Sequence, residues 1–343
     1  MYRLARALLF RLDAEAAHEI VTAQLARLQG SPALLAAVAS SCSATDETEV
    51  WGLRFPNRLG IGAGFDKDAL IPQALFALGF GFVEVGTVTL RPQAGNPRPR
   101  LFRYPDLKAL VNRMGFNNGG AEAAAARLRL LVEHRGTSVE HGPLFVNVGK
   151  NREVAAEDAA AAYAACYRIV APWADGAVIN VSSPNTPNLR DLQRPEHLAA
   201  ILEAVRRERE RISFAREGMH PILVKIAPDL TPSQLEGISE VALRLADGMV
   251  ATNTTIDHSP IPPGEDESGG LSGAPLFEAS TAALRRLRAL VGPDYPLVGV
   301  GGVMDGATAR AKLEAGADLV QVYTGFIYGG PRFARSVVRE MAR

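Results

Sequence analysis

The fold can be worked out from the stretch Gly176-Ala177-Val178-Ile179-Asn180-Val181-Ser182-Ser183-Pro184-Asn185-Thr186-Pro187, where an apolar run ends in hydroxyls, amides and prolines. The first part has the composition of a buried strand, and the prolines make the segment after it rigid. Polar side chains are therefore held where a strand ends, which is where α/β barrels carry their chemistry. The alternative is an ordinary turn, because Asn, Ser and Pro dominate turns.

Similar units recur along most of the chain. Short apolar runs occupy residues 59–65, 82–89, 144–150, 176–182, 221–227, 248–254, 296–302 and 319–325. Alanine-rich or charged segments with the periodicity of amphipathic helices follow them, such as residues 68–78, 154–171, 195–211, 232–246, 276–291, 307–315 and 332–341. Eight strand-then-helix units predict a TIM (β/α)8 barrel, with a doubly wound open sheet as the alternative. Long connections at 90–119 and 255–273 leave the carboxyl ends of strands and can reach over the active face.

The N-terminal segment lies outside this repeat. Residues 2–11 and 13–29 have the pattern of two short amphipathic helices, and Gly30-Ser31-Pro32 ends the second. Such a hairpin either packs against the barrel or lies on a membrane surface, because its apolar face is flanked by arginines. We expect two parts, an N-terminal extension of residues 1–40 and a barrel of residues 41–343.

Composition excludes several classes of protein. The formal net charge is zero with both signs mixed, so no nucleic-acid partner is indicated. Cys42 and Cys166 are far apart and form neither a metal nor a redox spacing, and no metal is expected. No run reaches the roughly 20 apolar residues of a membrane span, and no signal peptide is seen, so the body of the protein is expected in the cytoplasm.

Lysine is rare and therefore informative. The only lysines are Lys67, Lys108, Lys150, Lys225 and Lys312. Three of them, Lys67, Lys150 and Lys225, lie in or just after strand-like runs, where an ammonium is costly unless it meets an anion. The alternative is that each lysine simply extends from a strand end into solvent.

Each predicted strand from the second to the eighth ends either in polar side chains or in glycine-rich backbone with free amides. The second to sixth runs end in amides, hydroxyls and a lysine, at Thr87, Asn147, Asn180, Ser183, Lys225, Thr252, Asn253 and Thr254. The seventh and eighth end in Gly301-Gly302 and Tyr323-Thr324-Gly325, the usual phosphate position of a barrel. A phosphate beside many amide groups suits FMN.

A further segment could cover such a ligand. Asn112-Arg113-Met114-Gly115-Phe116-Asn117-Asn118 combines amides with glycine, which favours a ligand lid over a plain surface loop. Lys67, in the loop after the first strand, would be placed to meet a substrate carboxylate near it.

Together these segments resemble the dihydroorotate dehydrogenase family over the whole chain. The resemblance rests on Ala63-Gly64-Phe65-Asp66-Lys67, on residues 97–103 and 112–118, on 180–187, on Lys225-Ile226-Ala227-Pro228-Asp229, and on residues 251–255 and 269–273. It implies oxidation of dihydroorotate to orotate in pyrimidine synthesis, with one FMN per chain as the first electron acceptor.

The resemblance also implies roles for individual residues. Ser183 would be the base that removes the C5 proton while a hydride leaves C6 for the flavin, and it would need a hydrogen-bonded path for the proton. The implied substrate residues are Lys67, Asn112, Arg113, Met114, Gly115, Phe116, Asn180, Asn185, Asn253 and Thr254. The implied FMN residues are Ala63, Gly64, Phe65, Asp66, Lys67, Thr87, Asn147, Asn180, Lys225, Thr252, Gly273, Gly302, Tyr323 and Thr324.

The chain resembles class 2 of the family in two respects, a serine as the base and an N-terminal extension. That class implies an extension that attaches to the cytoplasmic face of the inner membrane as a peripheral protein and opens a tunnel to a membrane quinone. His18, Arg103 and Tyr323 resemble residues that line this tunnel. We expect a monomer.

Three rival functions stay open at this point. A class 1 enzyme would pass electrons to fumarate or NAD, a non-redox barrel would bind a sugar phosphate at Gly301-Gly302, and a third kind of barrel would bind metabolites without chemistry. The N-terminal helices argue against the first, and flavin absorption would argue against the second.

Overall fold

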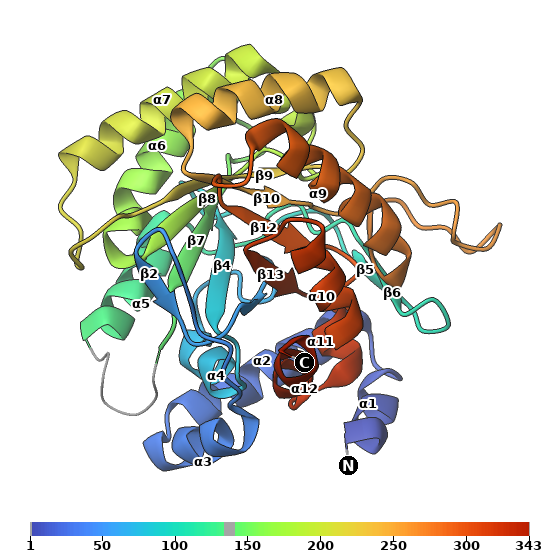
Figure 1. Cartoon of the computed structure of the whole chain (residues 1–343). Coiled ribbons are helices and arrows are strands. Elements are labelled where there is room, and N and C mark those ends of the chain that lie inside the picture. Colours follow the sequence, from blue (N-terminus) through green and yellow to red (C-terminus); the bar gives the residue numbers. More distant parts are fainter. Residues whose placement is uncertain (1, 134–140, 343) are drawn as a thin grey trace.

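Eight parallel strands close into a barrel at the centre of the computed structural model, which describes residues 2–133 and 141–342 (Figure 1). They are β3 (Leu59–Ile61), β4 (Phe82–Val88), β7 (Leu144–Val148), β8 (Gly176–Asn180), β9 (Ile222–Ile226), β10 (Gly248–Ala251), β12 (Leu297–Val300) and β13 (Leu319–Val322). Neighbours in the barrel follow chain order, and β13 pairs with β3 to close it. The predicted TIM barrel is confirmed, and the observed strands lie within the eight apolar runs.

Large apolar side chains fill the amino end of the barrel. Phe82, Phe145 and Leu319 are buried there together with Phe55. Phe55 belongs to a hairpin of β1 (Thr48–Val50) and β2 (Leu53–Phe55), a short two-stranded sheet outside the barrel. Because this end is packed with side chains, only the carboxyl ends of the strands leave room for a ligand.

Helices surround the barrel. They are α4 (Pro72–Ala77), α5 (Ala121–Glu133), α6 (Ala159–Val170), α7 (Pro195–Arg211), α8 (Pro232–Leu245), α9 (Phe277–Val291), α10 (Gly306–Glu314), α11 (Thr324–Gly329) and α12 (Phe333–Met341), with 3₁₀ turns η1 (Ala171–Trp173), η2 (Leu189–Gln193) and η3 (Ala274–Leu276). α5 and α11 are additional to the predicted helices. Reciprocal side-chain caps start α8 at Thr231 and α10 at Asp305, which satisfies amides that have no partner inside the helix.

The two long connections form a sheet of their own. β5 (Leu101–Tyr104) and β6 (Ala109–Asn112) come from the connection after β4, and β11 (Gly270–Gly273) comes from the connection after β10. β6 lies in the middle and pairs antiparallel with both, so Gly270 faces Asn112. The segments expected as loops over the active face therefore include a three-stranded sheet.

Three helices precede the barrel and lie at the bottom of the view in Figure 1: α1 (Tyr2–Leu9), α2 (Ala14–Gln29) and α3 (Pro32–Cys42). Two of them were expected, and α3 was not, because Pro32 was interpreted only as the end of α2 although proline is also favoured in a first helical turn. The Tyr2 hydroxyl donates to Ile327 O at 2.5 Å, which ties α1 to α11.

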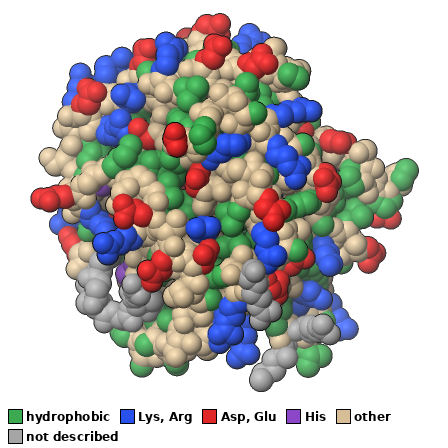
Figure 2. Space-filling model, viewed as in Figure 1, with side chains coloured by type: hydrophobic (Ala, Val, Ile, Leu, Met, Phe, Trp, Pro, Cys, Tyr) green, Lys and Arg blue, Asp and Glu red, His purple; other side chains and the backbone are tan. Residues whose placement is uncertain are grey.

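The visible surface shows basic and acidic side chains interspersed, without a large region of one sign (Figure 2). On α1, Leu4 and Leu8 are 74% and 65% exposed, so this short helix presents apolar side chains to its surroundings. Among residues 2–133 and 141–342, no helix combines the length and the apolar character that a membrane crossing requires.

Candidate active site

A cavity of about 1120 Å³, part of it open to solvent, lies over the carboxyl ends of the barrel strands. Most of the site residues expected from sequence line it: Ala63, Gly64, Lys67, Thr87, Asn112, Met114, Gly115, Phe116, Asn180, Ser183, Asn185, Lys225, Thr252, Asn253, Thr254, Gly273, Gly302, Tyr323 and Thr324. They come from all parts of the barrel and from β6 and β11. The cavity therefore brings together polar residues that lie far apart in the sequence.

Ser183 lies just beyond β8, where the strand gives way to the proline-containing loop. Its side chain is nearly buried, and its Oγ accepts a hydrogen bond from the Asn185 backbone amide at 3.2 Å. The neighbouring Ser182 is completely buried and donates to Asn180 Oδ1 at 3.1 Å. Of the two serines, therefore, only Ser183 lines the cavity.

A network of amides and hydroxyls lies beneath the cavity. Asn180 Nδ2 donates to Thr87 Oγ1 and to Asn147 Oδ1, each at 3.1 Å, and the Thr87 hydroxyl donates to Asn147 Oδ1 at 2.6 Å. Asn147 is fully buried and does not line the cavity itself. Its Nδ2 donates to Glu84 Oε1 at 2.6 Å, farther inside the barrel.

Glu84 places a carboxylate inside the barrel. It is completely buried, accepts from Gln321 Nε2 at 2.6 Å, and lies 3.7 Å from Lys225 Nζ. A buried carboxylate requires such donors, and Lys225 in turn gains a partner below the cavity floor. Sequence reasoning missed both Glu84 and Gln321, although a charged or amide side chain inside an apolar strand run is a usable signal.

Lys67 extends into the site from the loop after β3. Its Nζ donates to Gly64 O at 2.9 Å. Burial, opposed by the charge of Glu15, lowers the pKa of this ammonium to about 8. An ammonium in this setting gains most from a carboxylate brought by a ligand.

Lys150, by contrast, has a structural contact. Its Nζ donates to Val154 O at 2.8 Å, and the side chain does not line the cavity. Of the three lysines singled out from sequence, Lys67 and Lys225 reach the cavity and Lys150 does not.

The loop after β6 contacts the loop after β8. Asn185 Nδ2 donates to Asn112 Oδ1 at 3.1 Å, and Asn96 Nδ2 donates to Asn185 O at 3.1 Å and to Arg113 O at 2.9 Å. Through these bonds the two segments form one polar wall of the cavity. Asn96 was not among the expected site residues.

Three other expected residues lie outside the cavity lining. Arg113 Nη1 forms an ion pair with Glu267 at 2.8 Å, and its guanidinium covers the Phe102 ring at 4.5 Å. Asp66 accepts from the amides of Leu70 and Ile71, each at 2.8 Å, and so supports the loop behind Lys67. Phe65 lines a second cavity between the N-terminal helices and the barrel.

Two polar atoms in the cavity wall lack a hydrogen-bond partner. Among the described residues, no group bonds to Thr254 Oγ1 or to Gln321 Oε1, although both atoms are buried. A buried polar atom without a partner is costly, so these positions are suited to a ligand that supplies one.

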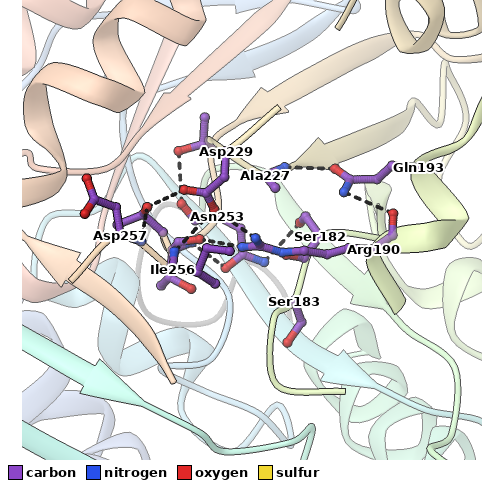
Figure 3. A network of polar contacts seen from close by, with 12 residues as sticks. Ser182, Ser183, Arg190, Gln193, Ala227, Asp229, Asn253, Ile256 and Asp257 are labelled. Atoms are coloured by element: carbon purple, nitrogen blue, oxygen red, sulfur yellow. Dashed lines mark hydrogen bonds and ion pairs between the residues drawn. The ribbon is translucent and has the colours of Figure 1, made fainter. Parts of the chain in front are cut away.

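Arg190 joins the segments that follow three of the barrel strands (Figure 3). It donates to Ser182 O at 3.1 Å and to Thr254 O at 3.0 Å, and it pairs with Asp229 at 2.8 Å. Asp229 also accepts from the Thr255 hydroxyl. The backbone next to Ser183 is thus fixed by a residue seven positions later that sequence reasoning did not single out.

A second, largely apolar cavity lies between the N-terminal helices and the barrel. Its lining includes Tyr2, Leu9, Phe10, Ala14, Ala17, His18, Val21, Leu25, Phe65, Leu78, Arg103, Phe326, Ile327, Gly330 and Pro331. Leu101 and Leu110 line both cavities, so only a thin wall separates the two.

Of the three expected tunnel residues, His18 and Arg103 line this second cavity, and Tyr323 lines the first. The Phe65 ring connects them, with its centroid 5.0 Å from that of His18 and 5.9 Å from that of Tyr323. Burial lowers the pKa of His18 to about 3, so the imidazole is neutral at physiological pH. Within the described residues, no group of His, Cys, Asp and Glu side chains is arranged to hold a metal ion.

Comparison with known proteins is consistent with this geometry. A family model described as dihydroorotate dehydrogenase matches residues 46–343. A protein from Acidovorax sp. (strain JS42) called dihydroorotate dehydrogenase (quinone) is 49% identical, over 99% of this chain and 98% of its own length. A protein of that name from Stenotrophomonas maltophilia (strain R551-3) is 47% identical, over 100% and 96%. A crystal structure of DHODH from Eimeria tenella in complex with ferulenol has a TM-score of 0.84 and 35% identity, and the match covers 95% of this chain and 90% of that one.

Proposed function

Because this chain belongs to the dihydroorotate dehydrogenase family, we propose that it oxidises dihydroorotate to orotate in pyrimidine biosynthesis and passes the electrons to a quinone. The overall balance is dihydroorotate plus quinone giving orotate plus quinol. The observation that carries the proposal is the pair of adjoining cavities, one with many hydrogen-bonding side chains at the strand ends and one almost wholly apolar beside α1 and α2. A sugar-phosphate isomerase or a passive metabolite binder has no need of the second.

We propose FMN as the resident cofactor of the larger cavity. The fit is supported by two buried side-chain oxygens of cavity-lining residues, Thr254 Oγ1 and Gln321 Oε1, which have no hydrogen-bond partner within the described residues and which a ligand with many hydrogen-bonding groups could satisfy. When bound, FMN accepts a hydride from the substrate and returns the electrons to the acceptor. The residues proposed to hold its ring are Ala63, Gly64, Lys67, Thr87, Asn180, Lys225 and Thr252, and those proposed for its phosphate end are Gly273, Gly302, Tyr323 and Thr324.

Three further residues of the expected FMN set act from behind the cavity in this proposal. Asn147 orients Thr87 and Asn180, Asp66 shapes the loop that carries Lys67, and Phe65 separates the two cavities. Lys225 supplies positive charge on the cavity floor, which suits negative charge on a reduced ring.

Ser183 is the proposed base at C5 of the substrate. The amide of Asn185 donates to its Oγ and so stabilises the negative charge that develops there as a proton is passed on. Burial excludes bulk water from the hydroxyl, so the proton must leave by a hydrogen-bonded path.

The substrate is proposed to bind between Ser183 and the loop after β6. Lys67 would meet its carboxylate, and the amides of Asn112, Asn180, Asn185 and Asn253, with the Thr254 hydroxyl, would hydrogen-bond its ring. Met114, Gly115 and Phe116 line the same wall. Arg113, which is paired with Glu267, would act only through its carbonyl, which Asn96 holds.

The central test is spectroscopic. Purified protein should carry flavin absorption, which anaerobic addition of dihydroorotate bleaches and addition of a short-chain quinone restores. NAD or fumarate in place of the quinone should restore little. Colourless protein that takes up no added FMN would refute the redox function, and reoxidation by NAD or fumarate at the quinone rate would place the chain with the class 1 acceptors.

The second cavity is the proposed quinone site, with His18 and Arg103 in its wall and Tyr323 on the flavin side. Arg103 Nη1 donates to Leu9 O at 3.0 Å and its guanidinium lies 4.7 Å from the centroid of the Phe10 ring, which links α1 to β5 at this cavity. A neutral His18 is compatible with an apolar ligand, because it adds no buried charge.

Filling the second cavity should slow only the quinone half of the reaction. Val21 lines the cavity, so Val21→Trp places an indole where the quinone would enter. We expect kcat/KM for quinone to fall by roughly tenfold or more, while the rate of flavin reduction by dihydroorotate stays unchanged. Stopped-flow measurement of the two half-reactions separates these effects.

Ile20→Trp is the matched control, because Ile20 is 45% exposed on the same helix and does not line the cavity. Its quinone kinetics should match those of the parent protein. If kcat/KM for quinone fell equally in both variants, or did not fall in Val21→Trp, the second cavity would not be the quinone site.

We further propose that residues 1–40 form a membrane-associating quinone extension on a barrel of residues 41–343, although α3 continues to Cys42. The exposed Leu4 and Leu8 on α1 support peripheral attachment to the cytoplasmic face of the inner membrane, where membrane quinone is found. The protein is proposed to act as a monomer.

A further inference from the structure

Lys312 is a buried lysine that the proposed reaction does not use. It lies on α10, is completely shielded from solvent, and its Nζ donates to Ser280 Oγ at 2.6 Å. Its Nζ also lies 5.3 Å from the centroid of the Phe277 ring. In the described part of the chain, no carboxylate forms an ion pair with it. Burial lowers the pKa of its ammonium to about 7, with Arg285 acting in the same direction and Glu278 against it.

Ser280 connects this lysine to the larger cavity. Ser280 Oγ accepts from Lys312, and its single hydroxyl proton faces three carbonyl oxygens, those of Leu276 at 2.8 Å, Gly301 at 3.0 Å and Phe277 at 3.1 Å. Donation to Gly301 O is the arrangement that links Lys312 to the cavity wall. Gly301 and Gly302 line the cavity at the end proposed for the cofactor phosphate. Lys312 therefore lies directly behind the cavity wall, separated from the ligand space by one hydroxyl and one peptide.

The orientation of that peptide matters. In a trans peptide the carbonyl and the following N–H point in opposite directions. Since the Gly301 carbonyl faces Ser280, the Gly302 N–H faces away from Ser280 and Lys312. The backbone of Phe277 packs so closely on Gly302 that only glycine fits there, which keeps this peptide in place.

We propose that Lys312 is a positioning residue for the phosphate end of the cavity: through Ser280 it fixes the Gly301 carbonyl, aims the Gly302 amide at the ligand, and supplies an unpaired positive charge behind it. This inference rests on FMN being the cofactor. It assigns to α10 a part in selecting a flavin that carries a phosphate over one that does not. The physical reason is that a dianion near Lys312 favours the charged form of this lysine and is then attracted by it in the low-dielectric interior, whereas a neutral hydroxyl in place of the phosphate gains nothing from the charge.

The test compares FMN with riboflavin, which lacks the phosphate. The dissociation constant of each flavin is measured by fluorescence quenching on the full chain after its own flavin has been removed. Lys312→Met keeps the length of the side chain and removes the charge. We expect FMN affinity to fall by about tenfold or more, while riboflavin affinity stays within about twofold of the parent value.

The matched control is Arg286→Met, which removes one exposed positive charge from α9, the helix that carries Ser280. It should leave the ratio of FMN to riboflavin affinity unchanged. Thermal melting of the flavin-free proteins provides a second readout. Flavin-free Lys312→Met should melt at the same or a higher temperature, because a buried charge is gone, and yet gain less stability from added FMN.

Ser280→Ala tests the same link without changing charge, and it should also reduce the FMN-to-riboflavin affinity ratio. If Lys312→Met does not fold, the affinity ratio of Ser280→Ala tests the proposal in its place. Equal loss of affinity for both flavins, or an unchanged ratio in both variants, would overturn the role of Lys312. Failure of the parent protein to bind either flavin would instead overturn the proposed cofactor, so the two failures are distinguishable.

Discussion

Replacing Ser183 by alanine is expected to slow the reduction of bound flavin by dihydroorotate by about 10²–10⁴-fold, the usual contribution of a general base. The hydroxyl lines the cavity, is nearly buried, and has the Asn185 amide as a donor to its oxygen. Flavin content and orotate affinity should change little, because many other groups line the site. Anaerobic stopped-flow recording of flavin bleaching measures the effect.

Ser182→Ala is the matched control for this prediction. It also deletes a buried hydroxyl next to β8, but one that bonds Asn180 and Asn253 and does not line the cavity. Its reduction rate should fall far less. Ser183→Cys should retain part of the rate, because the thiolate form of cysteine can accept the proton and become the thiol. An unchanged rate in Ser183→Ala would exclude this residue as the base.

The second large effect is expected at the ion pair between Glu15 on α2 and Arg100 before β5. Both side chains are only 6% exposed, and the guanidinium donates to Glu15 at 2.7–3.2 Å. Arg100 also donates to Ala94 O and Asn96 O, at 2.7 and 2.8 Å. The pair therefore joins the N-terminal extension to the loop whose Asn96 contacts Arg113 and Asn185.

Arg100→Met should lower the free energy of unfolding by about 3–5 kcal/mol, because it leaves Glu15 buried without its main partner. We also expect KM for dihydroorotate to rise, since the loop that carries Asn96, which contacts Arg113 and Asn185 in the cavity wall, loses its attachment to α2. Urea titration of the flavin-free protein and steady-state kinetics measure the two effects.

Arg98→Met provides an internal comparison. Arg98 also contacts Glu15, at 3.2 Å, but its side chain is 58% exposed and screened by solvent, so its loss should cost much less stability than the loss of Arg100. If Arg100→Met and Arg98→Met were equally stable, the buried pair would have no special part in joining α2 to the loop that carries Asn96.

The barrel could be predicted because each of its strands is a short apolar run of local sequence. Parallel strands that are buried on both faces have nearly continuous Val and Ile sequences, and their carboxyl ends meet on one side of the barrel. For that reason the polar residues that follow the runs could be grouped into one site before any contact was known. Most of them do line one cavity.

The sheet of β5, β6 and β11 could not be predicted in the same way. Its strands are four residues each, and β11 comes from a connection far along the chain from the other two. Strands this short carry too little pattern to be distinguished from loops. α3 was missed for a different reason, since the same Pro32 that stops α2 begins the next helix.

Periodicity and strand ends are properties of neighbouring residues, so the barrel, its polar strand ends and the N-terminal helices could be inferred from the sequence. The side chains that support the site from behind depend on how distant segments pack. Glu15 and Arg100 are 85 positions apart, and Lys312 and Ser280 are 32 positions apart. No local pattern marks such pairs, because a buried charge finds its partner only when packing brings distant segments together.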